Sequence, residues 1–168
     1  MPYQTNLHVE RLRSYLPFGS GHSQIYEEQA DPNLLRSLPT AAFEALQRLI
    51  QDPGKRLIIL TGDAGHGKTH LCRRLLQSVF GLAADDAHRL IRDGCDGGKE
   101  LGTVSGRDLR IVKDLSDHPE LFARNLLLQA LRAVDRVTVV CANEGKLRNV
   151  ASSSDELRPI IEAMEGNY

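Results

Sequence analysis

The segment TGDAGHGKTH, residues 61–70, stands between a short apolar run and an amphipathic stretch. The run before it, LIIL at 57–60, is continuous and apolar, which is typical of a strand covered on both faces. The stretch after it carries a wide apolar stripe, which predicts a helix over 69–80 that ends at Gly81. A glycine-rich loop that joins a buried strand to a helix restricts the chain to a layered α/β fold.

The loop has the spacing G-x-x-x-x-G-K-T of a phosphate-binding P-loop. Its glycines allow backbone N–H groups to surround a phosphate, and the helix that follows adds the positive end of its dipole. Lys68 is predicted to reach the β- and γ-phosphates of ATP, and the Thr69 hydroxyl to ligate Mg²⁺. We expect His70 to be an exposed helical residue, with a contact to the α-phosphate or base as the alternative, and His66 to have no special role. The predicted nucleotide-binding residues are Gly62, Asp63, Ala64, Gly65, His66, Gly67, Lys68, Thr69 and His70.

The rest of the chain alternates between strand and helix patterns, which predicts a parallel sheet flanked by helices in the three layers of a P-loop NTPase. We interpret residues 1–36 as an N-terminal arm and residues 37–168 as the P-loop core. The further predicted elements are a helix over 43–50, a short helix over 85–92, a loop over 92–106, a strand over 109–114, a helix that Pro119 begins in its first turn and that runs to 134, a strand over 137–142 and a helix over 159–165.

Composition sets the class of protein. A chain of 168 residues fits one domain, and its net charge of −1 does not indicate a nucleic-acid or membrane surface. Three widely spaced cysteines argue against a disulfide framework and a zinc site and favour buried, idle thiols. Without an apolar leader or a run long enough to span a membrane, the chain is expected to be cytoplasmic.

An acidic side chain follows the predicted strand over 109–114. Asp114 falls at the carboxyl end of that strand, where open α/β sheets place ligand chemistry. A carboxylate there can hold Mg²⁺ through water, as a Walker B aspartate does. The alternative is an ordinary surface residue, and Asp117 is expected to cap the helix that begins near Pro119.

Together the segments GDAGHGKTH, DLSD and NEG resemble the ATPase core of AAA+-like or STAND-like P-loop proteins. The string NEGKLR is also similar to that of ATPases in bacterial DNA-modification and phage-defence systems of the DptF type. This resemblance implies ATP-driven work on DNA or on partner proteins in a homo-oligomer or larger complex. A complete AAA+ module adds a fifth strand, an arginine finger and a helical lid; none can be located after Met164, so the core is expected to be C-terminally incomplete.

The same resemblance suggests roles for two residues after the strand over 137–142. In the sheet order that such ATPases share, this strand lies between the P-loop strand and the Walker B strand. Asn143 resembles a sensor residue that orients the attacking water, and Glu144 would supply the catalytic carboxylate, because Leu115 occupies the usual position for that residue. The alternative is a simple turn with a solvated glutamate, and Arg148 is either an arginine finger or part of a solvated helix start.

Three functions are compatible with these features. The main interpretation is an ATPase that hydrolyses Mg-ATP with Lys68, Asp114, Asn143 and Glu144. The alternatives are a STAND-like nucleotide switch that hydrolyses slowly or never, and a P-loop kinase. A GTPase is disfavoured because neither N-K-x-D nor D-x-x-G occurs in the chain.

Overall fold

The computed structural model describes residues 40–63, 67–94 and 100–166. The predicted arm over 1–36 and loop residues Ala64, Gly65 and His66 lie outside the described residues. The helices are α2 (Ala41–Gln51), α3 (Lys68–Phe80), α4 (Ala84–Gly94), α5 (Glu120–Arg132), α6 (Glu144–Ser152) and α7 (Arg158–Glu165), with two short 3₁₀ turns at Leu115–Asp117 and Asp155–Leu157. The strands are β1 (Leu57–Thr61), β2 (Glu100–Val104), β3 (Arg107–Val112) and β4 (Arg136–Ala142).

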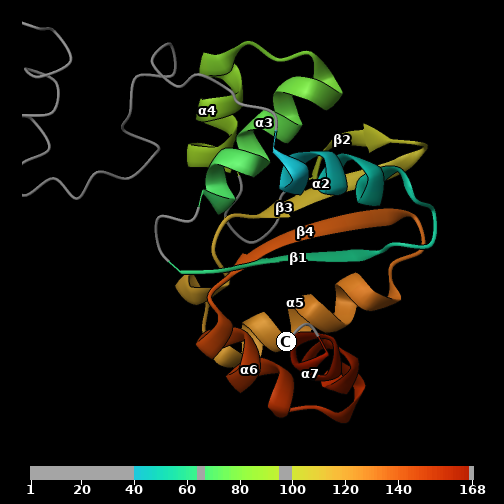
Figure 1. Ribbon diagram of the computed structural model, residues 1–168, viewed down its shortest axis with the longest axis vertical. Helices are drawn as coiled ribbons and strands as arrows, with labels where there is room; N and C mark the ends of the chain where they lie inside the picture. Colours follow the sequence, from blue (N-terminus) through green and yellow to red (C-terminus); the bar gives the residue numbers. More distant parts are fainter. Residues whose placement is uncertain (1–39, 64–66, 95–99, 167–168) are drawn as a thin grey trace, which may run out of the picture.

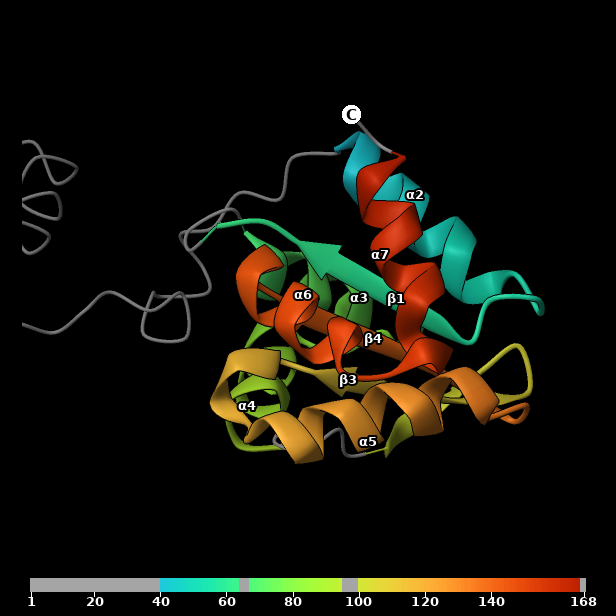
Figure 2. The ribbon, with the colours of Figure 1, turned by 90° about the horizontal axis from the view of Figure 1, so that it is seen from below.

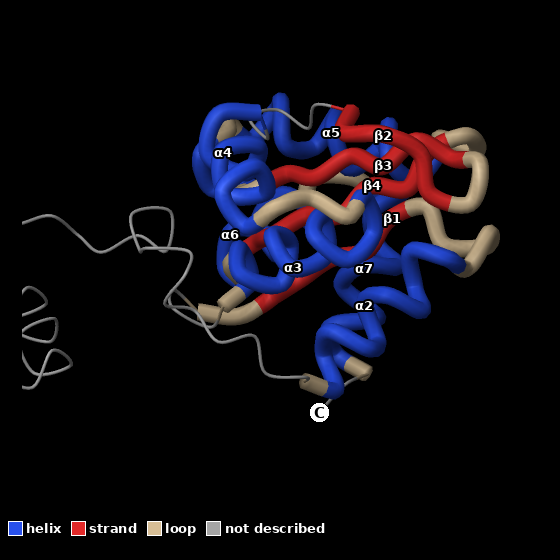
Figure 3. The backbone as a smooth tube through the Cα atoms, turned by 90° about the horizontal axis from the view of Figure 1, so that it is seen from above, coloured by secondary structure: helices blue, strands red, loops and turns tan. Residues whose placement is uncertain are grey.

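The strands form one sheet in the order β1-β4-β3-β2, which can be followed in Figure 3. The pairs β1–β4 and β4–β3 are parallel, whereas β2 is antiparallel to β3. The predicted parallel sheet is therefore confirmed for three strands. The predicted position of the 137–142 strand, between the P-loop strand and the strand that precedes Asp114, is also confirmed.

The edge strand β2 contradicts the prediction of a loop over 92–106. Its glycine was interpreted as a turn signal, but Gly102 lies within the strand at φ 144°. A Cβ atom at Gly102 would lie 2.8 Å from Cε1 of Phe80, so the ring of Phe80 occupies the space that a side chain would need. This glycine marks a close approach between a strand and a helix.

Helices cover both faces of the sheet, which confirms the three-layer fold (Figure 1). Helices α2, α3 and α4 lie on one face of the sheet, and α5, α6 and α7 lie on the other. Figure 2 views the molecule from the side of α5, α6 and α7. Successive side chains of a strand point to opposite faces of the sheet. Val139 and Cys141 therefore pack in the core on the side of α2, α3 and α4, while Val140 and Ala142 pack in the core on the side of α5, α6 and α7. The strand β4 is thus buried on both sides, as its continuous apolar sequence predicts.

The helix boundaries largely follow the sequence signals. Helix α3 ends at Gly81, which adopts the left-handed conformation at φ 63°. Pro119 occupies the position before the first residue of α5 rather than the first turn itself. The predicted cap by Asp117 is wrong, because Asp117 lies in the 3₁₀ turn at Leu115–Asp117 and α5 has no side-chain cap.

Arg107 joins the start of β3 to the end of α2. Its side chain is 8% exposed, and its guanidinium donates to three backbone carbonyls. The acceptors are the oxygens of Lys55 at 2.6 Å, Ile50 at 2.9 Å and Asp52 at 2.8 Å. The bond to Ile50 satisfies a carbonyl in the last turn of α2, and the bonds to Asp52 and Lys55 hold the turn that follows the helix. Arg107 therefore fixes the turn from which β1 enters the sheet.

Within the described residues, no helix is both long and apolar enough to cross a membrane.

Candidate functional site

The predicted phosphate-binding loop joins β1 to α3, as the sequence required. Two of its glycines adopt backbone angles that other residues rarely take, since Gly62 has φ 143° and Gly67 has φ 77°. Gly67 precedes the first residue of α3, and no side chain caps this helix. The first-turn N–H groups of a helix without a capping side chain are suited to binding an anion. The local backbone therefore fits a phosphate site.

Lys68 is the first residue of α3, and its side chain turns back over the loop. Its ammonium donates to the carbonyl oxygen of Gly62 at 2.7 Å and to that of Asp63 at 2.9 Å. Both acceptors are neutral backbone groups, so a phosphate oxygen would be a stronger partner for the same ammonium. Lys68 is thus positioned within the loop that it is predicted to serve.

His70 differs from its expected environment. The residue is half-buried rather than exposed, and its Nδ1 atom lies 2.7 Å from Nη2 of Arg73. A guanidinium can only donate, so Nδ1 accepts this hydrogen bond. Because Arg73 is 5% exposed, the bond fixes the His70 ring against the buried side of α3.

Asp114 lies beyond β3, which ends two residues earlier at Val112. Its Oδ1 atom accepts from the N–H of Ser116 at 2.8 Å and so begins the 3₁₀ turn. A carboxylate has further acceptor positions, so this bond leaves capacity for a metal or its water. Since Val112 pairs with Val140 in parallel register, Asp114 comes level with the end of β4.

Asn143 and Glu144 follow β4 directly and lie beside the phosphate loop. In the register of β1 with β4, Thr61 pairs with Ala142. Gly62 and Asn143 are therefore the next residues on two adjacent strands, about 5 Å apart in the sheet direction. Asp114 lies one strand further away, at about 10 Å from the end of β1 by the same spacing. The three strand ends thus meet at one edge, as the sequence predicted.

Both residues also have structural partners. Asn143 caps α6, because its Oδ1 accepts from the N–H of Lys146 at 2.8 Å. The Glu144 carboxylate accepts from Nη2 of Arg148 at 3.0 Å and from Nε at 3.2 Å. The Glu144 side chain is 44% exposed. Helix α6 therefore sets the orientation of both side chains, and the sequence offered a helix here only as one of two interpretations of Arg148.

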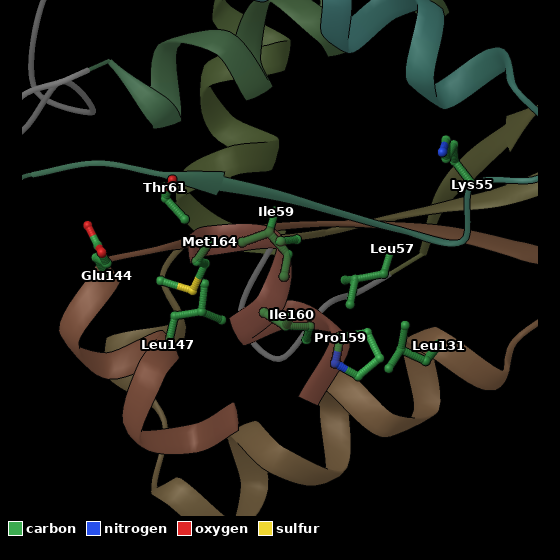
Figure 4. A pocket seen from close by; sticks show the side chains of 11 residues that line it. Lys55, Leu57, Ile59, Thr61, Leu131, Glu144, Leu147, Pro159, Ile160 and Met164 are labelled. Carbon is green, nitrogen blue, oxygen red and sulfur yellow. The ribbon is translucent and has the colours of Figure 1, made fainter. Parts of the chain in front are cut away.

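A cavity of about 750 Å³ lies between β1 and the helices α6 and α7. Thr61 and Glu144 lie at its end nearest the phosphate loop, and Leu57 and Leu131 lie at the opposite end (Figure 4). Its walls are mostly apolar and include Met164 of α7. Sequence reasoning did not find this cavity, because it depends on how α7 folds back beside β1.

The described residues contain no group of three or more His, Cys, Asp or Glu side chains that could hold a metal ion by themselves. Thr69 and Asp114 nevertheless supply the hard oxygen ligands that Mg²⁺ prefers, and Mg²⁺ in nucleotide sites is commonly held by one or two side chains plus phosphates. The chemistry of these two side chains suits Mg²⁺ bound together with a nucleotide, and their role as its ligands stays a prediction.

Comparison with known proteins relates the chain to nucleotide kinases. No protein-family model matches it, and no solved structure matches it significantly. The chain is 32% identical to human guanylate kinase over 120 residues, which cover 64% of this chain and 59% of the relative. It is 30% identical to the guanylate kinase of Sus scrofa over 118 residues, covering 62% and 58%.

The chain thus spans about three fifths of the length of the curated relatives it matches. These matches give no support to the resemblance to AAA+, STAND or DptF-type ATPases. The interpretation that they favour is the P-loop kinase, which the sequence had left as an alternative. The chain is distantly similar to guanylate kinases, and its mostly parallel sheet between helices is consistent with a P-loop kinase fold.

Proposed function

We propose that this chain binds Mg-ATP on the loop from Gly62 to Thr69 and transfers its γ-phosphoryl group to a nucleoside monophosphate. The observation that carries the proposal is the strand–loop–helix unit with Lys68 folded over the loop at 2.7 and 2.9 Å. The similarity to guanylate kinases supports the nucleotide acceptor, since guanylate is the substrate in their name.

Each residue of the loop has a defined part in this proposal. The N–H groups after Gly67 face the phosphates, and Lys68 exchanges its two backbone carbonyls for phosphate oxygens. The Thr69 hydroxyl ligates Mg²⁺, and Asp114 holds the ion through water. The metal neutralises charge on the phosphates, while the protein positions them.

A second candidate function is ATP hydrolysis, and one observation favours it specifically. The strand β4 lies between β1 and β3, which brings Asn143 and Glu144 beside the phosphate loop. A carboxylate at this position can orient and help to deprotonate a water molecule. In this function water takes the place of the nucleotide acceptor. The roles in binding Mg-ATP stay the same for the loop, Lys68, Thr69 and Asp114.

The decisive experiment measures ADP formation from Mg-ATP under four conditions: no acceptor, guanylate, other nucleoside monophosphates, and DNA. Formation of ADP only with a monophosphate, together with the matching diphosphate, supports the kinase. Formation of ADP and phosphate without an acceptor supports the ATPase and overturns the kinase. Binding of ATP with no turnover in any condition overturns both and favours a nucleotide switch.

Binding itself is measured by titration calorimetry on the same chain. The variant Lys68→Ala tests the loop, and Arg89→Ala on α4 is the matched control, because Arg89 is an exposed cation whose partner is Asp86 on the same helix. Loss of binding in the first variant alone supports the site. Equal binding in both variants would place the nucleotide elsewhere.

A further inference from the structure

Two cysteines from different layers of the fold meet beneath the phosphate loop. Cys72 lies on α3 and Cys141 on β4, and their Sγ atoms are 3.4 Å apart. Each residue is 1% exposed, and both belong to the core between the sheet and the first helical layer. The sequence predicted buried thiols, which is confirmed for these two, but their separation of 69 positions in the sequence concealed their contact. Cys95 lies outside the described residues.

We propose that Cys72 and Cys141 are a redox modification site, at which a peroxide converts the two thiols into a disulfide that clamps α3 to β4. A disulfide bond is about 2.05 Å long, so the two sulfur atoms must approach by a little more than 1 Å. Forming the bond therefore requires the two side chains to rotate or α3 and β4 to move closer together.

The chemistry balances with hydrogen peroxide as the oxidant. One cysteine loses its proton, and its thiolate attacks a peroxide oxygen; the O–O bond breaks, and the leaving hydroxide takes up that proton, which gives a sulfenic acid and water. The second thiol then attacks the sulfenic sulfur, the S–O bond breaks, and a second water leaves with the thiol proton. Two thiols are oxidised by two electrons, and one peroxide is reduced to two waters.

Burial affects the two steps differently. The first step is slow, because peroxide reaches a thiol that is 1% exposed only when the core opens locally. The second step is fast, because the partner sulfur is already in contact and outcompetes any thiol in solution. The intermediate sulfenic acid therefore does not accumulate, and the product is the disulfide between these two residues.

The position of the pair gives the disulfide a consequence, which rests on the proposed nucleotide binding. Cys72 lies about one helical turn after Lys68, and Cys141 lies two residues before Asn143. Closing the sulfur contact shifts the first turns of α3 relative to the end of β4. Because phosphate binding by backbone N–H groups tolerates little displacement, we expect the oxidised protein to bind Mg-ATP at least about 10-fold more weakly than the reduced protein.

The test treats the folded 168-residue chain with hydrogen peroxide, blocks remaining thiols by alkylation and digests with trypsin without reductant. The expected product joins the peptide THLCR, residues 69–73, to VTVVCANEGK, residues 137–146. The third cysteine should be found alkylated in DGCDGGK, residues 93–99. A disulfide that involves Cys95, or the alkylated forms of THLCR and VTVVCANEGK alone, overturns the proposal.

Variants and a second measurement separate the clamp from nucleotide binding. Cys95→Ser should still form the disulfide, and Cys72→Ala and Cys141→Ala should each lose it. The oxidised parent should unfold at a higher temperature than the reduced parent, and dithiothreitol should reverse the shift; an unchanged or lower temperature contradicts the clamp. If the reduced and oxidised forms bind Mg-ATP equally, the effect of the disulfide on nucleotide binding is overturned. If neither form binds Mg-ATP, the proposed function is contradicted, and the peptide analysis alone then tests whether the disulfide forms.

Discussion

Thr61 and Ala142 pair across the parallel strands β1 and β4, and the residue that follows each of them begins a functional segment. After Thr61 the chain enters the phosphate loop at Gly62, and after Ala142 it reaches Asn143 and Glu144. Parallel pairing therefore places the loop and the two polar residues at the same edge of the sheet. If the loop binds a nucleotide as we propose, this pairing would bring Asn143 and Glu144 beside its phosphates.

Replacing Lys68 with alanine should weaken Mg-ATP binding by about 100-fold, because a charged hydrogen bond contributes about 1.5–3 kcal/mol. The effect on stability should be small, since the partners of the ammonium within the described part of the chain are two neutral carbonyls, those of Gly62 and Asp63. Titration calorimetry measures the affinity, and thermal unfolding measures the stability. Binding within 3-fold of the parent would contradict the site.

Removing the Thr69 hydroxyl should reduce binding of Mg-ATP but leave metal-free ATP binding nearly unchanged. We expect Thr69→Ala to lower the affinity in the presence of Mg²⁺ by roughly 10-fold or more, because one oxygen ligand of the metal is lost. The matched control is Thr69→Ser, which keeps the hydroxyl and should bind like the parent. A loss in both variants, or an equal loss without metal, would point to a packing effect instead.

Replacing Glu144 with glutamine distinguishes the two candidate reactions. If water is the acceptor, Glu144→Gln should lower ATP hydrolysis by about 100-fold or more while ATP affinity stays the same. The control is Arg148→Ala, which removes the ion pair but keeps the carboxylate. Hydrolysis at the parent rate in Glu144→Gln would exclude the carboxylate as the base, and a loss only in Arg148→Ala would assign the effect to the ion pair.

Substitutions at Asn143 separate its capping function from a catalytic one. Asn143→Ala should destabilise the protein by about 1 kcal/mol, because the N–H of Lys146 loses its acceptor. Asn143→Ser can still cap α6 and should keep the stability of the parent. Urea unfolding measures both. If Asn143→Ser has parent stability but reduced turnover, the amide acts in the reaction; if its turnover equals that of the parent, Asn143 is a structural cap.

Much of the fold follows from local patterns in the sequence. The strands β1 and β4 were predictable because both are continuous apolar runs, and α3 because its apolar stripe ends at a glycine. The strand β2 was not, since Gly102 resembles a turn residue until Phe80 is seen to occupy the space beside it. Helix α6 was expected only as an alternative, a helix start near Arg148, because it is short and has a glycine in its first turn.

The candidate site was predictable to the same extent. The loop spacing indicated Lys68 and Thr69, and the strand ends indicated Asp114 and Asn143; the strand register places these segments at one edge of the sheet, and their functional roles stay predictions. What the sequence could not show are contacts between distant elements, such as the 3.4 Å approach of Cys72 to Cys141. The partner of Glu144 was also hidden, because an ion pair with Arg148 requires that both lie on one helix whose existence was not evident.

Arg107 is expected to be the most important polar side chain for the stability of the fold. It donates to the carbonyls of Ile50, Asp52 and Lys55, all within 2.6–2.9 Å. Arg107→Ala should lower the free energy of unfolding by about 3 kcal/mol, because the buried Ile50 carbonyl and the half-buried bonds to Asp52 and Lys55 lose a charged donor. The midpoint of urea unfolding should fall without a change in its slope.

Two further variants identify the cause of that loss. Arg107→Lys keeps the charge but lacks the planar arrangement of donors that reaches three carbonyls, so it should recover only part of the lost stability. Arg89→Ala, on the exposed surface of α4, should change the stability by no more than about 0.5 kcal/mol. Full recovery in Arg107→Lys would mean that charge alone matters. A loss below about 1 kcal/mol in Arg107→Ala would mean that water replaces the guanidinium and that the turn before β1 is held by its own backbone.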